Sequence, residues 1–303
     1  MLNIIINLSI FIFVILIGYL LKYFGLFKKQ DADMISKLIL YLTLPCALLS
    51  NANNMVITVD TFKMVLIAIS ANLILVLIGY FYAKGDDTKR QAAFMINSSG
   101  YNIGNFALPF VEIFFPGLGV AYLCMFDIGN AIMGLGITYV MAHCVAYAKT
   151  NINCKEILKK IGSSIPFDTY MLMLVLALLH IRLPNFIINT AKMIGSGNGF
   201  LAMFMIGLLI EFHIPKSEVK DVINIMMIRM IGNVVISLII YFLIPLPELA
   251  KKILILALFT PIASVAPVFS RKCGYVKEMP AISNSVSIFV SIIAIIVVLL
   301  ILN

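Results

Sequence analysis

Long apolar runs separated by short polar segments make up nearly the whole chain. A helix that crosses a bilayer needs about 20 mostly apolar residues, and we identify ten runs of this kind. They are 2–21, 38–59, 64–83, 91–111, 118–148, 165–181, 193–210, 222–244, 253–270 and 279–303. The pattern predicts an all-α integral membrane protein with ten transmembrane helices.

Composition supports a lipid rather than an aqueous environment. Hydrophobic residues make up 62% of the chain and charged residues 12%, whereas a soluble domain has about 25% charged residues. A chain this apolar has too few polar groups to cover its surface in water, so the lipid bilayer is its expected partner. The first run has neither a basic segment before it nor a small-residue cleavage motif after it, and we interpret it as a permanent span rather than a signal peptide.

The basic residues give the chain a formal net charge of +8. They stand in short clusters between apolar runs, which is typical of membrane topology and argues against a nucleic-acid partner. With the N-terminus placed outside, inward-facing loops hold 15 of the 22 Lys and Arg residues and outward-facing loops hold 5. The positive-inside rule therefore predicts a multi-pass protein of the cell membrane with both termini outside.

The ten runs divide into two groups of five, 1–148 and 165–303, joined by a predicted cytoplasmic loop at 149–164. Because five is odd, the second group would be inverted relative to the first, as in many secondary transporters. Prolines interrupt the fourth run at Pro109 and the ninth at Pro261 and Pro267. This match predicts two inverted five-helix repeats in which helices 4 and 9 are broken.

Each of these prolines lacks an amide hydrogen and clashes with the carbonyl four residues before it. We expect Pro109 to free the carbonyl of Asn105, Pro261 that of Ala257, and Pro267 that of Ala263. Such breaks survive in lipid where they face protein or a water-filled cavity, and the N-termini of half-helices attract anions. Two broken helices that cross would form an anion site, although a single proline can also be a simple kink.

The fourth run is rich in amide side chains beside its glycines. Asn102 and Asn105 lie on either side of Gly104, a few residues before Pro109. An asparagine amide donates two hydrogens without a permanent charge, so it can hold a carboxylate without burying a cation. The alternative is that these amides bond neighbouring helices, as polar residues in membranes often do.

The run NIGNFALPF at 102–110 resembles the N-x-G-N-x-G-L-P signature of the auxin efflux carrier family, with Ala107 where a glycine is usual. Four further stretches resemble spans of that family in the same order. They are SKLILYLTLPCALLSN at 36–51, FDIGNAI at 126–132, FMIGLLI at 204–210 and TPIASVAPVFSRKCGY at 260–275. The short central loop is similar to that of prokaryotic-type malate and malonate permeases.

The resemblance implies a scaffold domain, a transport domain and a substrate site at the crossover of helices 4 and 9. It implies carboxylate substrates such as malate, malonate or an indole acid, and homodimers occur in the family. Asn102, Asn105 and Pro109 match the crossover residues of the fourth span. In the ninth span either Pro261 or Pro267 matches the crossover proline, which leaves the contacts of Ser264 and Val265 open.

Few charges lie within the predicted spans. Asp127 stands about ten residues into the fifth, where a charge usually has a role or a partner. It would relay a proton, bind a cation such as sodium, or pair with Arg229. Glu112 would face either the same cavity or the outer aqueous mouth. Asn130 with its neighbouring glycine would let the fifth span approach another helix closely.

These features favour a secondary carrier that works by alternating access. No Walker motif occurs, so ATP is not the expected energy source. A sodium-coupled symporter of the bile-acid type is an alternative that shares inverted repeats. An intramembrane enzyme is disfavoured because the sequence has no GxSxG nucleophile elbow and only an isolated Asp86–Asp87 acidic pair. We assign no catalytic residue, cofactor or metal, and the five scattered cysteines contain no CxxC pair.

Overall fold

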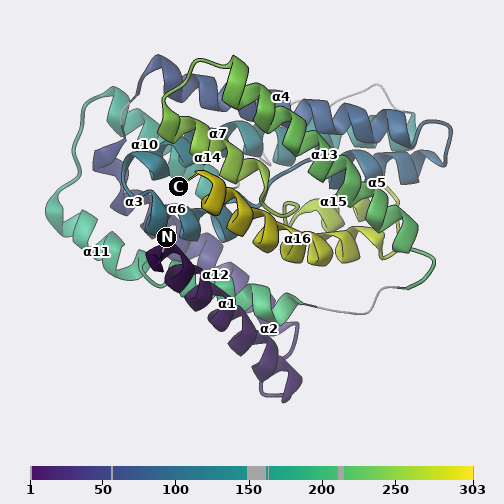
Figure 1. Cartoon of the computed structure of the whole chain (residues 1–303), viewed down its shortest axis with the longest axis horizontal. Coiled ribbons are helices and arrows are strands. Elements are labelled where there is room, and N and C mark those ends of the chain that lie inside the picture. The colour runs from purple at the N-terminus through teal and green to yellow at the C-terminus, as the bar shows by residue number, and fades with distance from the viewer. Residues whose placement is uncertain (1, 56, 149–161, 163, 211–214, 303) are drawn as a thin grey trace.

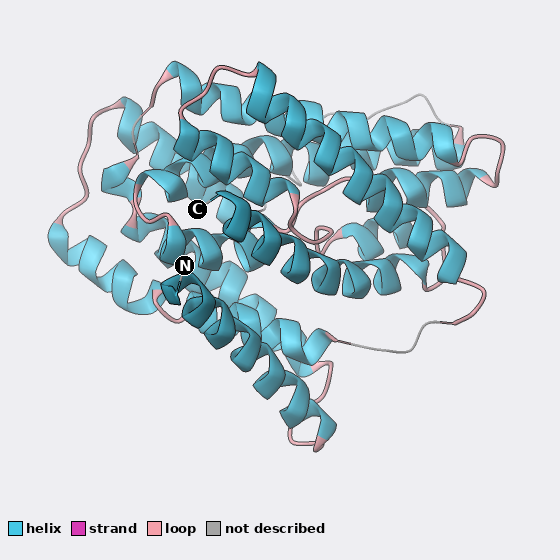
Figure 2. Cartoon of the chain, in the orientation of Figure 1, coloured by secondary structure: helices cyan, strands magenta, loops and turns pink. Residues whose placement is uncertain are grey.

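The structure is a computed structural model that describes residues 2–55, 57–148, 162, 164–210 and 215–302. All regular secondary structure in these residues is helical, and no strand occurs among them (Figure 2). The elements are α1 (Leu2–Tyr23), α2 (Asp31–Leu38), η1 (Ile39–Thr43), α3 (Leu44–Ser50), η2 (Ala52–Asn54), α4 (Val59–Tyr82), α5 (Thr88–Ser98), η3 (Ile103–Ala107), α6 (Leu108–Phe114), α7 (Leu118–Ala131), η4 (Ile132–Ile137), α8 (Thr138–Tyr147), α10 (Ile165–Leu178), α11 (Asn185–Gly195), α12 (Asn198–Leu209), α13 (Val219–Leu243), α14 (Glu248–Leu258), α15 (Ala266–Lys272) and α16 (Met279–Leu302).

Among the described residues, six helical segments are long and apolar enough to cross a membrane by length and composition. They are Asp31–Ser50, Val59–Tyr82, Leu118–Tyr147, Asn185–Leu209, Val219–Leu243 and Met279–Ile301, and two shorter apolar helices are Ser9–Tyr23 and Ile165–Leu178. The prediction of an all-α, multi-pass membrane protein is therefore confirmed. The count of ten spans and their inverted repeat stay predictions. The loop expected at 149–164 lies, apart from residues 162 and 164, outside the described residues.

The boundaries of two predicted spans are wrong. The segment expected at 38–59 begins at Asp31 and ends at Ser50, and the one expected at 193–210 begins at Asn185. In both places helical structure extends over polar residues that precede the apolar run. Residues 31–37 form most of α2, and residues 185–192 form most of α11, which a turn at Ser196 and Gly197 separates from α12. Apolarity alone does not reveal such polar helical segments.

The fourth predicted span is broken, but not at its proline. Helix α5 ends at Ser98, and residues 99–102 are not helical before η3 begins. Gly100 has a φ of +73°, a conformation that a side chain disfavours. Pro109 instead lies beyond this break, at the second residue of α6, which follows η3 without interruption. The expectation that Pro109 makes the break is therefore wrong.

The ninth predicted span is interrupted between the end of α14 at Leu258 and the start of α15 at Ala266. Pro261 lies within the interruption, whereas Pro267 lies in the first turn of α15, as Pro109 does in α6. The two carbonyls expected to be free are rebonded locally. The carbonyl of Ala257 accepts from the Thr260 hydroxyl at 2.7 Å, and the carbonyl of Ala263 accepts from the Ala266 amide at 3.0 Å.

The helices pack as two groups. The first, which we call the arm group, consists of α1, α2, η1, α3 and α10–α12, and its members contact mainly one another. The second, the core group, consists of α4–α8 with η3 and η4, and α13–α16. Figure 1 shows α1 and α2 projecting at one end, with α12 beside α1. The groups meet where α10 packs on α7 and where α12 packs on α6 and η3.

Within the arm group, α1 and α12 approach backbone to backbone. A Cβ atom added at Gly207 would lie 2.2 Å from the carbonyl oxygen of Ile15, and one added at Gly18 would lie 2.5 Å from that of Phe204. Small residues that allow such close approach are the usual means of joining helices in lipid, where there is no hydrophobic driving force between them. These two glycines therefore fix the position of α1.

Candidate functional site

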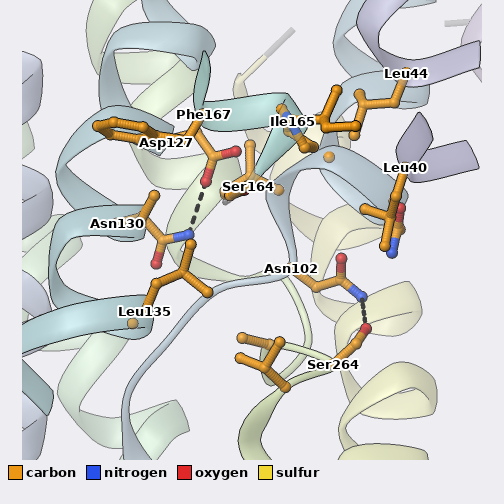
Figure 3. A pocket seen from close by; sticks show the side chains of 18 of the residues that line it. Leu40, Leu44, Asn102, Asp127, Asn130, Leu135, Ser164, Ile165, Phe167 and Ser264 are labelled. Atoms are coloured by element: carbon orange, nitrogen blue, oxygen red, sulfur yellow. Dashed lines mark hydrogen bonds between the residues drawn. The ribbon is translucent and has the colours of Figure 1, made fainter. Parts of the chain in front are cut away.

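The two helix breaks contact each other directly. The backbone amide of Asn102 donates to the carbonyl of Pro261 at 3.0 Å, and its side-chain amide donates to the Ser264 hydroxyl at 3.2 Å (Figure 3). A Cβ atom added at Gly100 would lie 3.2 Å from that of Ala263. The chain thus crosses itself at two non-helical segments that are far apart in the sequence.

Two asparagines from neighbouring helices hold the first break in place. Asn72 on α4 accepts from the amide of Gly100 at 2.8 Å. Asn130 on α7 accepts from the amide of Tyr101 at 3.0 Å and donates to the carbonyl of the same residue at 2.8 Å. These side chains replace the helical hydrogen bonds that the break forfeits, which buried peptide groups require.

The second break is held from α16. The amide of Ile262 donates to the Ser287 hydroxyl at 3.0 Å. The side-chain amide of Asn284 donates to the carbonyls of Ile262 and Ala263 at 3.0 and 3.3 Å. Both breaks are therefore supported by side chains rather than left as open kinks.

Arg229 on α13 connects the two breaks, because it donates hydrogen bonds to carbonyls of both. Its side chain is 1% exposed, and one terminal nitrogen donates to the carbonyls of Ser98, Ser99 and Gly100 at 3.1, 2.9 and 3.0 Å. The other terminal nitrogen donates to the carbonyl of Thr260 at 3.1 Å. The carbonyls of Ser98, Ser99 and Gly100 lie at the C-terminal end of α5, and that of Thr260 lies just after the C-terminal end of α14. Helix dipoles concentrate negative charge at such ends. Arg229 is bonded to carbonyls and does not pair with Asp127, so that alternative is wrong.

Several of these supporting residues were not predicted from the sequence. Asn72 and Asn233 are two of them. Asn233 accepts from the Tyr101 hydroxyl at 2.9 Å and donates to the carbonyl of Leu258 at 2.6 Å. The sequence contains one signal of this pair. Residues 60–82 align with residues 221–243 without a gap, and Asn72 then occupies the same aligned position as Asn233. The aligned stretches also share the identical residues Asp60 and Asp221, Tyr80 and Tyr241, and Phe81 and Phe242.

A cavity of about 240 Å³ lies beside the crossing, between the arm group and the core group. Six of the predicted site residues line it, namely Asn102, Gly104, Asn105, Asp127, Asn130 and Ser264. Four others do not line it, namely Pro109, Glu112, Pro261 and Pro267. Pro109 faces Gly199 of α12, and Glu112 is half-buried further along α6.

Gly104 and Asn105 bring η3 close to the arm group and to the cavity. A Cβ atom at Gly104 would lie 2.6 Å from a methyl carbon of Leu44. Asn105 is 5% exposed, and its side-chain oxygen has no hydrogen-bond partner among the described residues. This oxygen is enclosed by protein and only accepts hydrogen bonds, so it is not itself a contact for an anion.

Asp127 adds a carboxylate to the cavity wall and is 9% exposed. One of its oxygens accepts from Asn130 at 2.8 Å, as Figure 3 shows, and the other accepts from the Tyr170 hydroxyl at 2.6 Å. In the part of the chain that the structure describes, no three His, Cys, Asp or Glu side chains lie close enough to hold a metal ion. The wall therefore presents amides, hydroxyls and one acid.

Two comparisons with known proteins bear on this arrangement. A family model described as "Membrane transport protein" matches residues 3–164. The chain is also 22% identical over 218 residues to an uncharacterized transporter of Methanocaldococcus jannaschii, a match that covers 69% of this chain and 68% of that protein. The family match spans the first break and most of the residues that line the cavity.

Proposed function

This chain belongs to the membrane transport protein family, and from that premise we propose that it is a secondary carrier of a small organic anion, a mono- or dicarboxylate. The observation that carries the proposal is the hydrogen bond between the Asn102 amide and the Pro261 carbonyl. It joins two helix breaks beside a cavity, and paired breaks of this kind form the substrate sites of many carriers.

The chemistry of the cavity wall supports an anionic substrate. Asn102 and Asn105 offer side-chain amides that donate hydrogen bonds to a carboxylate. The amide groups at the start of η3, which continues into α6, add the positive end of a helix dipole. Arg229, the nearby cation, is already bonded to four carbonyls. Amides and backbone groups therefore hold the anion.

The position of the cavity supports alternating access. Its wall combines residues of the arm group, such as Leu40 and Phe167, with residues of the core group, such as Asn102 and Asn130. A displacement of one group past the other would open the cavity to one side and close it to the other. The alignment of Asn72 with Asn233 supports two inverted repeats of five spans as the basis of this movement.

The carrier is proposed to act in the cell membrane with both termini outside, as the distribution of basic residues favours. A homodimer is part of the proposal because dimers occur in the family that the sequence resembles. Energy would come from a proton or sodium gradient rather than from ATP.

Uptake by purified protein in proteoliposomes tests the proposal, with radiolabelled malonate, malate and an indole acid as probes. We expect uptake of at least one of them, and a loss of roughly 10- to 100-fold in apparent affinity for Asn102→Ala and Asn105→Ala, since a hydrogen bond to a charged group contributes about 1.5–3 kcal/mol. The matched control is Asn54→Ala, at an exposed position in η2 away from the cavity. Absence of uptake of every carboxylate by folded protein, or unchanged affinity in both cavity variants, would contradict the proposal.

A further inference from the structure

A hydrogen bond at the cavity wall joins one helix group to the other. The hydroxyl of Tyr170, on α10 of the arm group, donates to Asp127, on α7 of the core group, at 2.6 Å. This distance falls in the range of bonds from a hydroxyl to an ionised carboxylate, which are roughly twice as strong as neutral ones. The charge on Asp127 therefore strengthens a contact between two groups of helices that otherwise meet at few places.

The same carboxylate is linked to the helix break. Its second oxygen accepts from Asn130, whose amide also pairs with the backbone of Tyr101. One oxygen of Asp127 thus contacts Tyr170 of the arm group, and the other contacts Asn130, the side chain that positions the crossing. A change in its charge alters both contacts at once.

No cation balances this carboxylate among the described residues. Arg229 is bonded to carbonyls and lies against the ring of Tyr101. Lys63 of α4 bonds to Asp60, and Lys251 of α14 bonds to a carbonyl on α13. The other ionisable groups near Asp127 are Tyr170 and Cys124, one turn earlier on α7, and Glu112 on α6 lies near Cys124. All three are neutral or negative, so an ionised Asp127 is stabilised by hydrogen bonds from Tyr170 and Asn130 but by no counter-cation, which is costly in lipid.

We propose that Asp127 binds the coupling proton of this carrier, and that binding this proton weakens the contact with Tyr170 and so frees the two helix groups to move. The proton attaches to a carboxylate oxygen, while Tyr170 keeps its own hydrogen. A proton fits this place better than a metal cation, because both carboxylate oxygens already face donors, the Tyr170 hydroxyl and the Asn130 amide. A bound cation would need acceptors there.

Proton and anion then favour each other's binding. An anion held by Asn102 shares the cavity with Asp127, and two like charges at close range in a medium of low dielectric repel strongly. Protonation removes this repulsion, and by reciprocity the bound anion raises the proton affinity of Asp127. The proposal rests on the proposed function for the identity of the anion, whereas the proton site itself is detectable without any anion.

Fluorescence provides the test, because the chain contains no tryptophan. Phe167→Trp places a single indole in the cavity wall, on the same helix as Tyr170. In proteoliposomes without substrate, we expect its emission to change reversibly with pH. The change should be lost in the background of Asp127→Asn and kept in that of Glu112→Gln, the matched acid that does not line the cavity.

Two further variants keep the test informative if Asp127→Asn folds poorly. Asp127→Glu retains a carboxyl group and should retain a pH response with a displaced midpoint. Tyr170→Phe removes a donor that stabilises the ionised form, so the midpoint should move to higher pH. A tyrosine that served packing alone would leave the midpoint unchanged.

Malonate distinguishes a failure of this inference from a failure of the proposed function. Added malonate should raise the apparent proton affinity by roughly 5- to 150-fold, the usual range of coupling between sites. If the pH response depends on Asp127 but no carboxylate shifts it, the proton site is supported and the proposed substrate class is contradicted. A pH response that survives Asp127→Asn overturns the inference. A response to sodium chloride but not choline chloride that requires Asp127 overturns it in favour of a sodium site.

Discussion

The side-chain amide of Asn130 forms hydrogen bonds with both peptide groups of Tyr101, accepting at 3.0 Å and donating at 2.8 Å. The pairing imitates the ladder contact of a neighbouring strand, in a region where α5 has ended and η3 has not begun. A non-helical segment inside a membrane protein is stable only when such partners satisfy its backbone. The helix break is therefore built by side chains from other helices.

Replacing Asn130 tests this support. In Asn130→Ala the amide and the carbonyl of Tyr101 lose their partners, and each buried unpaired group costs about 1–3 kcal/mol. We expect the melting temperature of the purified protein to fall clearly, as measured by thermal unfolding in detergent. The exposed-site variant Asn54→Ala should melt like the wild type. Equal melting of Asn130→Ala and wild type would show that Asn130 does not hold the break.

Arg229 should not tolerate lysine. An ammonium group has one nitrogen, whereas the guanidinium reaches carbonyls of both breaks with two, and the fork geometry is fixed. We expect Arg229→Lys to lower the free energy of unfolding by roughly 2–4 kcal/mol, because several buried carbonyls lose their donors. Arg271→Lys, at an exposed position near the end of α15, should have little effect. Comparable unfolding of both variants would rule out the bridging role of Arg229.

The contact between α1 and α12 predicts a sharp size limit at Gly207. A Cβ atom there would lie 2.2 Å from the carbonyl of Ile15, which the rigid backbone cannot relieve without moving the helix. We expect Gly207→Ala to destabilise the protein by about 1–3 kcal/mol, the usual cost of overpacking. Gly134→Ala, where an added Cβ meets no atom within 4 Å, is the control in the same melting assay. A stable Gly207→Ala protein would mean that α1 is free to shift.

Much of the site was predictable from residue types along the chain. The amides at Asn102 and Asn105, the acid at Asp127 and the hydroxyl at Ser264 stand out in apolar runs, because polar groups are costly there, and all of them line the cavity. The location of the first break was not predicted. Pro109 does not mark it, because Pro109 lies beyond the break, within the helical segment formed by η3 and α6.

The partners of the breaks were harder to foresee. Asn72, Asn284 and Ser287 lie in long apolar helices and contact backbone groups that are remote in sequence. Their roles depend on which helices are neighbours, and hydrophobic runs alone do not determine this. Arg229 was recognised as unusual, but charge complementarity suggested a carboxylate partner instead of the four carbonyls that it binds.

The central claim is that the crossing of the two breaks is the place through which the substrate passes. Ser264 is exposed to the cavity beside Asn102, so Ser264→Cys, in a background without the native cysteines, reports on access to it. The direct measurement is its rate of modification by a membrane-impermeant thiol reagent, applied to either side of proteoliposomes with and without malonate. The account predicts modification from both sides and protection by malonate. Modification from one side only, unaffected by malonate or by any other carboxylate carried, would contradict it.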